Sequence, residues 1–193
     1  MNVPTLDLSK FISGNDQERK TFSDDLGQSF NQTGFAIIKN HDLEKELTDE
    51  LYKVIKAFFD LEDEKKIKYY FPDLYGQRGY VVKGQEHAKG SKKGDLKEFF
   101  HIGNPLISNP QNIWPHEVES FNEIGSEVFI TLENIGLTLL RAISIYLNLD
   151  INYFEDKVKG GESILRSIHY FPLDTSDISD GAVRAAAHGD INL

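Results

Sequence analysis

Cysteine is absent from the 193 residues of this chain, and methionine and tryptophan occur only once each. Without cysteine the chain can form no disulfide, no thiolate zinc site and no iron–sulfur cluster. The first residues also lack the basic segment followed by an apolar one that marks a secretory signal. These absences favour a cytoplasmic protein and leave histidines, carboxylates and aromatic side chains as the groups available for chemistry.

Positive charge is scarce as well. The chain has 21 Lys and Arg residues against 31 Asp and Glu residues, which gives a formal net charge of −10 at pH 7. Such a surface repels phosphate backbones and anionic lipids, so we expect neither nucleic acid nor a membrane as a partner. No apolar run in the sequence looks long enough for a membrane span.

The apolar residues, 39% of the chain, are enough for one sizeable core, and we expect a single domain over residues 1–193. Helical spacing of apolar residues predicts helices over residues 16–31, 43–70 and 121–147. Strands are expected over residues 3–8, 34–40, 163–171 and 183–193, with loop and strand over 76–103 and a proline-rich connector over 104–116. Most helices therefore precede most strands, which indicates an α+β fold whose main sheet is only beginning at the end of the sequence.

The last predicted strand contains a histidine and an aspartate two positions apart, His188 and Asp190. Residues at i and i+2 of a strand point to the same side, so the imidazole and the carboxylate could bind one metal ion. They would supply two ligands of a 2-His-1-carboxylate site, whose open positions suit the non-haem Fe(II) oxygenases. The alternative is an ordinary surface histidine beside an acidic residue.

Several segments, taken together and in order, resemble one enzyme family. They are VPTLDLSKF, TGFAIIKNH, FFDLEDEKKIKY, RGYVVKGQE, GDLKEFFHIGNP, ILRSIHYFPL and RAAAHGDINL. By these segments the chain resembles the isopenicillin N synthase-like branch of the Fe(II)/2-oxoglutarate-dependent dioxygenases over nearly its whole length. The competing assignment, a cupin-type metal hydrolase, would explain the H-x-D pair but not the GDLKEFFHIG and LRSIHYFP segments.

The resemblance implies roles for individual residues. His188 and Asp190 match the first two Fe(II) ligands, and Tyr170 matches an aromatic position beside the cosubstrate 2-oxoglutarate. Arg166 shares the strand face of Tyr170 and is a candidate for binding a carboxylate, because a planar guanidinium suits that geometry. The alternative for Arg166 is a surface ion pair. Many relatives carry asparagine where Ile168 stands, so one polar contact to the cosubstrate is missing here.

Three further residues are weaker candidates for the substrate side of the site. Arg184 has the same strand parity as His188, and Glu98 and Tyr80 lie in the two segments that precede the main sheet. The ordinary alternative for Glu98 is an exposed acid on a strand. His169 is expected to be structural, because it points away from the face of Tyr170.

The implied enzyme consumes O2 and 2-oxoglutarate to hydroxylate, desaturate or cyclise a small molecule. Its implied fold is a helical N-terminal region, residues 1–120, followed by a long helix and the first strands of a double-stranded β-helix (jelly-roll) core over 121–193. The second histidine ligand and the arginine that binds 2-oxoglutarate have no match in this sequence, so the jelly roll is expected to be incomplete.

Three explanations for the missing ligands stay open at this level. The chain is expected to be an inactive fragment of a longer enzyme, because a domain boundary should not fall within a strand. Alternatively, it is a shortened, non-catalytic relative that acts as a binding or interaction module. In the third explanation, a second chain or a dimer completes the sheet.

Overall fold

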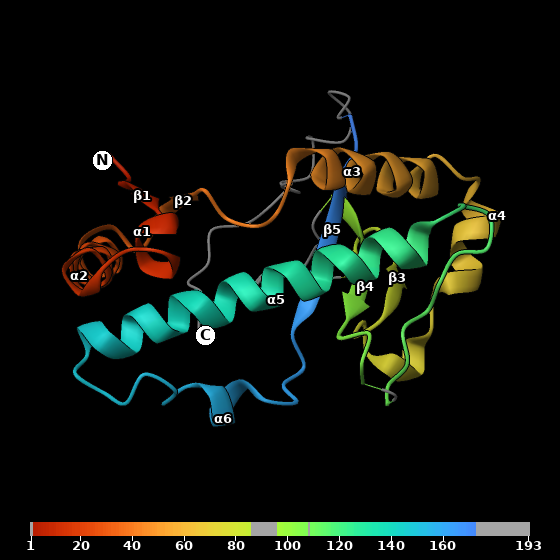
Figure 1. Ribbon diagram of the computed structural model, residues 1–193. Coiled ribbons are helices and arrows are strands. Elements are labelled where there is room, and N and C mark those ends of the chain that lie inside the picture. The colour runs from red at the N-terminus through yellow and green to blue at the C-terminus, as the bar shows by residue number, and fades with distance from the viewer. Residues whose placement is uncertain (1, 86–95, 108, 173–193) are drawn as a thin grey trace. The chain divides into compact units, whose positions relative to one another are not determined.

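The computed structural model describes residues 2–85, 96–107 and 109–172, shown as coloured ribbon in Figure 1. This part combines helices with two small sheets, which confirms the α+β class. The helices are α1 (Ser9–Ile12), α2 (Asp16–Thr33), α3 (Lys45–Phe59), α4 (Asp63–Lys66), α5 (Phe121–Tyr146) and α6 (Glu155–Val158), with 3₁₀ turns η1 (Ile67–Tyr69) and η2 (Pro72–Leu74). The strands are β1 (Thr5–Asp7), β2 (Ile37–Lys39), β3 (Gly79–Val81), β4 (Lys97–Gly103) and β5 (Ile164–Tyr170).

The chain forms two compact units, each assembled from two segments. Unit 1 contains residues 1–49 and 130–161, and unit 2 contains residues 50–129 and the segment that begins at Glu162. The long helix α5 contributes residues to both units. The single-domain organisation expected from the sequence stays a prediction.

Unit 1 is built around the parallel pair of strands β1 and β2, in which Leu6 lies opposite Ile38. Its buried core consists of Leu6, Leu8, Phe11, Phe22, Leu26 and Ala142. The helix α2 begins at a capping box, because the Asn15 side chain accepts from the Glu18 backbone and the Glu18 side chain accepts from the Asn15 backbone, both at 3.0 Å. It ends at Gly34, whose φ of 77° is the left-handed conformation that glycine adopts without strain.

Unit 2 contains the antiparallel sheet β3–β4–β5, with β4 in the centre, as the strands in Figure 1 show. One face of this sheet packs on an aromatic core centred on Phe58, which is fully buried. The ring of Phe58 meets those of Phe100 and Phe121 edge-on, at centroid distances of 4.7 and 6.0 Å. The predicted strand over residues 163–171 and the predicted helix over 121–147 are confirmed by β5 and α5.

The continuous helix predicted over residues 43–70 is wrong, because the chain breaks after α3 and restarts as α4. Glu62, with ψ of 144°, is extended and serves as the N-cap of α4. Asp63 and Glu64 follow in the first turn, where negative charge stabilises the positive end of the helix dipole. Helical periodicity continues across such a break, so the pattern of apolar residues did not reveal it.

By length and composition alone, α5 could cross a membrane, so the expectation that no segment reaches that length is wrong. The same helix supplies Phe121 and Phe129 to the core of unit 2 and Ala142 to the core of unit 1. It also carries acidic residues, among them Glu123, Glu127 and Glu133. The helix α5 thus contributes side chains to the core of each unit.

Candidate functional site

Strand β5 presents its residues alternately to two sides. Arg166, Ile168 and Tyr170 are exposed, whereas Ser167 is buried and His169 is half-buried. The predicted common face of Arg166, Ile168 and Tyr170 is therefore confirmed, and so is the opposite orientation of His169.

The register with β4 extends this face across the sheet. Directly opposite residues in an antiparallel pair point to the same side. We call the resulting set the Tyr170 face. It consists of the facing pairs Lys97 and Tyr170, Phe99 and Ile168, and His101 and Arg166.

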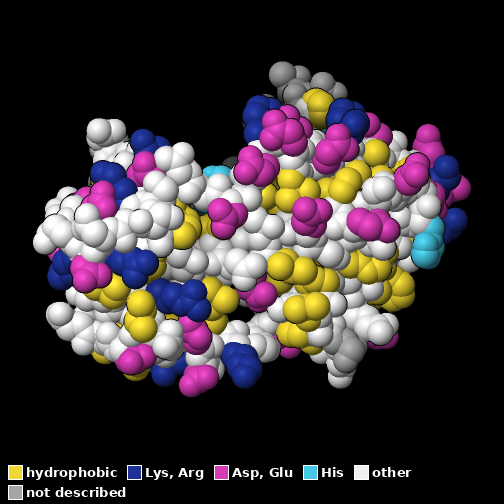
Figure 2. Space-filling view, viewed as in Figure 1, with side chains coloured by type: hydrophobic (Ala, Val, Ile, Leu, Met, Phe, Trp, Pro, Cys, Tyr) yellow, Lys and Arg dark blue, Asp and Glu magenta, His cyan; other side chains and the backbone are white. Residues whose placement is uncertain are grey.

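Two cations of the Tyr170 face flank one aromatic ring. The Arg166 guanidinium lies 4.7 Å from the ring centroid of Phe99, and Lys97 Nζ lies 5.2 Å from the same centroid. None of the six residues of this face is a carboxylate. Figure 2 shows acidic and basic side chains interspersed over the viewed surface, so the composition of the Tyr170 face differs from the mixed charge seen there.

The opposite side of the sheet carries a buried ionic network around Glu98, which is only 1% exposed. Lys66 Nζ lies 3.0 Å from Glu98 Oε2 and 3.3 Å from Oε1, and the Tyr80 hydroxyl donates to Oε2 at 2.5 Å. His169 Nδ1 lies 2.7 Å from Oε1. Because the carboxylate paired with Lys66 can only accept, Nδ1 of His169 carries the proton.

The network changes the proton affinity of its members. Burial, with a smaller contribution from the hydrogen bond to Glu98, raises the pKa of Tyr80 well above its usual range. Burial alone would lower the pKa of Lys66. Its hydrogen bonds to Asp63 and Glu98, together with the attraction of both carboxylates, outweigh burial and raise that pKa. The folded protein therefore holds Lys66 charged and Tyr80 neutral.

These contacts revise the sequence-based interpretation of Glu98. Its alternative assignment as an exposed acid is wrong, because the side chain is buried and accepts from three residues. Tyr80, 6% exposed, belongs to the aromatic core of unit 2. Both residues lie on the face opposite Tyr170, and their assignment to the substrate side stays a prediction. His169 is structural, as expected.

Arg78 is a second buried cation, and no pattern in the sequence predicted it. It is 1% exposed, and its Nη1 donates to the backbone oxygen of Gln77 at 2.7 Å. Its Nε and Nη2 have no hydrogen-bond partner among the residues that the structure describes. Burial lowers the pKa of Arg78, and the charge of Glu162 opposes that effect. The guanidinium lies against Gly103, where a side chain would collide with it.

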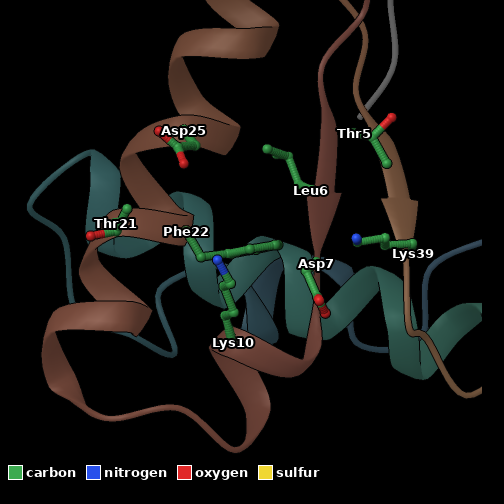
Figure 3. A pocket seen from close by; sticks show the side chains of 8 residues that line it. All are labelled: Thr5, Leu6, Asp7, Lys10, Thr21, Phe22, Asp25 and Lys39. Carbon is green, nitrogen blue, oxygen red and sulfur yellow. The ribbon is translucent and has the colours of Figure 1, made fainter.

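No residue of the Tyr170 face lines either of two hollows found in the described part of the chain. In unit 1, a pocket of about 180 Å³ is lined by Thr5, Leu6, Asp7, Lys10, Thr21, Phe22, Asp25 and Lys39 (Figure 3). Hydrogen bonds from Ser9 and Asn40 lower the pKa of Asp7, so this carboxylate already has local partners. This volume is smaller than the ~300 Å³ at which ligand sites usually begin.

The hollow in unit 2 is larger, about 620 Å³, and contains mainly aromatic and apolar side chains with a few polar ones. It is lined by Lys68, Tyr69, Phe71, Asn112, Ile113, Trp114, His116 and Glu117. The Tyr69 hydroxyl donates to Glu117 and accepts from the backbone N–H of His116 at 3.0 Å. Tyr69 and Glu117 are thus paired with each other, and Asn112 is paired with the backbone of Gly103.

The predicted iron ligands His188 and Asp190, with Arg184, lie outside the described residues. Within residues 2–85, 96–107 and 109–172, no three His, Cys, Asp or Glu side chains are grouped so that they could hold a metal ion. The role of all three residues therefore stays a prediction.

Comparison with known proteins identifies the relatives of the chain. Residues 3–117 match the family described as the N-terminal part of the non-haem dioxygenases in morphine synthesis. The 2-oxoglutarate-dependent dioxygenase ecdK of Aspergillus rugulosus is 30% identical over 100% of this chain and 64% of its own length. Leucoanthocyanidin dioxygenase of Malus domestica is 32% identical over 98% of this chain and 53% of its own.

A solved structure agrees. A full-length Neurospora crassa protein crystallised with α-ketoglutarate, which is 2-oxoglutarate, has a TM-score of 0.85 and 27% identity, covering 97% of this chain and 61% of that protein. The chain spans less than two thirds of the length of these relatives. On the family match and these likenesses, the chain belongs to the 2-oxoglutarate-dependent non-haem dioxygenase family, whose N-terminal part it matches.

Proposed function

We propose that this chain is part of an oxygenase that uses Fe(II), 2-oxoglutarate and O2 to oxidise a small organic molecule. The observation that carries the proposal is the composition of the Tyr170 face. Two cations flank Phe99 there, the Tyr170 phenol shares the face, and Glu98, the acidic residue of β4, is turned to the other side. In a chain of net charge −10, a sheet face of this kind suits a dianion.

The hydrogen-bond donors that would bind the cosubstrate lie on this face. The Tyr170 hydroxyl, 40% exposed as a residue, donates a hydrogen bond to a carboxylate of 2-oxoglutarate. Arg166 offers the planar fork that pairs with carboxylates in a bidentate manner. Ile168 stands between them and contributes an apolar wall, where many relatives have a polar contact. Lys97, which the sequence analysis overlooked, adds a second positive charge.

His188 and Asp190 would hold the metal, since imidazole nitrogen and carboxylate oxygen are ligands that Fe(II) accepts. When bound, the iron would supply the activation of O2. The protein supplies the geometry, by holding the cosubstrate carboxylate against Tyr170 and Arg166. We assign the third ligand to a histidine outside this sequence, in line with the length that the relatives have beyond it.

The antiparallel pair of β4 and β5 is consistent with the first strands of a jelly-roll core. The substrate class is a small molecule, and relatives support this. The Neurospora crassa protein has been crystallised with thymine, and other relatives are named for proline or leucoanthocyanidin. Hydroxylation is the reaction that we propose first, because one relative is named a proline hydroxylase.

The test is anaerobic binding followed by turnover. The whole protein that contains this chain, loaded with iron, should develop the visible charge-transfer absorbance of an Fe(II)–2-oxoglutarate complex, and admission of O2 should yield succinate. His188→Ala and Asp190→Ala should abolish both signals. His116→Ala, which removes an exposed histidine, is the matched control and should leave both unchanged.

Two outcomes would contradict the proposal. Succinate formation at the wild-type rate in His188→Ala or Asp190→Ala would remove that residue from the metal site. A protein that binds neither Fe(II) nor 2-oxoglutarate would favour the alternative of a non-catalytic binding module.

A further inference from the structure

We infer that Glu98 and His169 form a positioning pair, which holds β5 so that Tyr170, on the opposite face, keeps its hydroxyl where the cosubstrate carboxylate binds. The inference rests on the proposed function for the identity of the ligand. Its structural part is the contact between Glu98 and His169 near the end of β5, which we call the clamp. This part rests on contacts within unit 2 alone.

The clamp lies at the end of the ladder between β4 and β5. The register runs from Gly103 opposite Ile164 to Lys97 opposite Tyr170, so Tyr170 belongs to the last pair. Backbone pairing is least stable at such an end, where strands fray. Glu98 and His169 form the pair immediately before it, and their side chains are joined at 2.7 Å. This contact therefore stabilises the pairing where the ladder would otherwise open.

The anchor of the clamp is itself fixed. Glu98 is 1% exposed, and Lys66 and Tyr80 hold its oxygens from α4 and β3. The four residues thus join four elements, α4, β3, β4 and β5. A buried carboxylate with three donors has little freedom to follow a moving strand. The hydrogen bond from His169 to this fixed carboxylate therefore sets the position of β5.

Aromatic packing restricts the imidazole further. The ring of His169 lies 5.2 Å from that of Phe59 and 4.7 Å from that of Phe171, measured between centroids. Because consecutive strand residues point to opposite sides, fixing the direction of His169 also fixes that of Tyr170. A rotation of the strand that displaced Tyr170 would pull His169 off Glu98.

The experiment is a double-mutant cycle on 2-oxoglutarate affinity, measured anaerobically in the iron-loaded protein by the charge-transfer absorbance. His169→Ala and Tyr170→Phe should each raise Kd by about fivefold, the effect of one hydrogen bond. If His169 acts through Tyr170, the double variant should also lose about fivefold rather than the roughly 25-fold of two independent effects. His169→Asn keeps a donor near the position of Nδ1 and should restore Kd to within about twofold of wild type.

A second measurement, hydrogen exchange, reports the clamp without any ligand. The amides of β5 should exchange faster in His169→Ala than in wild type, while those of α5 should not change. Lys56→Ala is the control, because it removes an exposed ion pair with Asp60 in the same unit. This comparison separates loosening of one strand from a general loss of stability.

Independent effects in the cycle, or unchanged β5 exchange in His169→Ala, would overturn the positioning role. A wild-type protein that fails to bind 2-oxoglutarate would refute the proposed function and, with it, the assignment of Tyr170 to this cosubstrate. Faster β5 exchange in His169→Ala would then still establish the clamp on the strand.

Discussion

His169 and Tyr170 are consecutive residues of β5 that face opposite environments. Nδ1 of His169 lies 2.7 Å from Oε1 of Glu98, a carboxylate that is 1% exposed, whereas Tyr170 is 40% exposed. The acidic group is thus kept on the core side of the sheet, and none of the described residues of β3, β4 and β5 places a carboxylate on the side that carries Arg166 and Lys97. One strand serves both the stability of the fold and the charge of the candidate site.

The first prediction concerns the buried ion pair. Replacing Glu98 with alanine leaves the Lys66 ammonium, whose side chain is 5% exposed, with only the exposed carboxylate of Asp63. We expect the free energy of unfolding to fall by about 3 kcal/mol, the usual cost of breaking a buried pair from one side. Urea unfolding of the variant and of wild type measures the difference.

The control for this prediction is Asp60→Ala, which breaks an exposed pair with Lys56 and should change stability by less than about 1 kcal/mol. The double variant Glu98→Leu with Lys66→Met should recover much of the loss, since no unpaired charge remains buried. Equal destabilisation by Glu98→Ala and Asp60→Ala would contradict the burial of the pair.

The second prediction is a loss of stability at alkaline pH. The folded state raises the pKa of both Lys66 and Tyr80 above their usual values of 10.5 and 10.0. Above about pH 10 the unfolded chain releases these protons while the folded chain keeps them, so the folded state binds more protons. The free energy of unfolding should therefore fall as pH rises through this range, and be unaffected by these groups at lower pH.

Urea unfolding between about pH 8 and about pH 11 measures this slope. Tyr80→Phe removes one of the two groups and should make the alkaline slope shallower. Tyr52→Phe, at a tyrosine that is 70% exposed, should leave the slope as it is in wild type. Identical slopes in all three proteins would show that Tyr80 is not held neutral by its surroundings.

Local patterns predicted much of this fold. Alternation of side chains along β5 correctly grouped Arg166, Ile168 and Tyr170, because the period of a strand is a property of its own residues. The helical spacing of apolar residues likewise predicted α5. The family followed from several short segments in order, none of which needed knowledge of the fold.

What the sequence could not reveal was the pairing of distant residues. Lys66 and Glu98 are 32 positions apart, and His169 is 71 positions from Glu98. The register of β4 against β5 brings His169 to Glu98, and the packing of α4 brings Lys66 to the same carboxylate. No local signal in the sequence reports either arrangement. A lone glutamate in a strand looks exposed until its partners are known, which is why Glu98 was misjudged.

The third prediction tests the contact of Arg78 with Gly103. A Cβ at Gly103 would lie 2.0 Å from Cζ of Arg78, so Gly103→Ala must displace a buried guanidinium. We expect a loss of about 1–3 kcal/mol in the free energy of unfolding, as for other overpacked interiors.

Gly136→Ala is the control, for which we expect the free energy of unfolding to rise. Among the described residues, nothing beyond the adjoining backbone of its own helix lies within 4 Å of that Cβ, and alanine in a helix interior stabilises by up to ~1 kcal/mol.

A double variant identifies the cause. With Arg78→Ala already present, the added methyl group of Gly103→Ala meets no guanidinium, and its further cost should be small. An undiminished cost in that background would mean that a neighbour other than Arg78 rejects the side chain.

The fourth prediction concerns the charge of the Tyr170 face and rests on the proposed use of 2-oxoglutarate. Arg166→Met keeps the length of the side chain but removes the guanidinium. We expect Kd for 2-oxoglutarate to rise by about tenfold, because a hydrogen bond to a charged group contributes about 1.5 kcal/mol or more. The affinity should also depend less on ionic strength, since one attractive charge is gone. Titration of the iron-loaded protein at two salt concentrations measures both effects.

Lys157→Met is the matched control for this last prediction. Lys157 Nζ also lies over an aromatic ring, 4.2 Å from the centroid of Tyr153, but it belongs to unit 1 rather than to the sheet of unit 2. Its loss removes the same charge and the same kind of contact, so net charge alone would affect both variants equally. A raised Kd in Arg166→Met only would assign the effect to the Tyr170 face. Wild-type affinity in Arg166→Met would exclude Arg166 from the binding of 2-oxoglutarate.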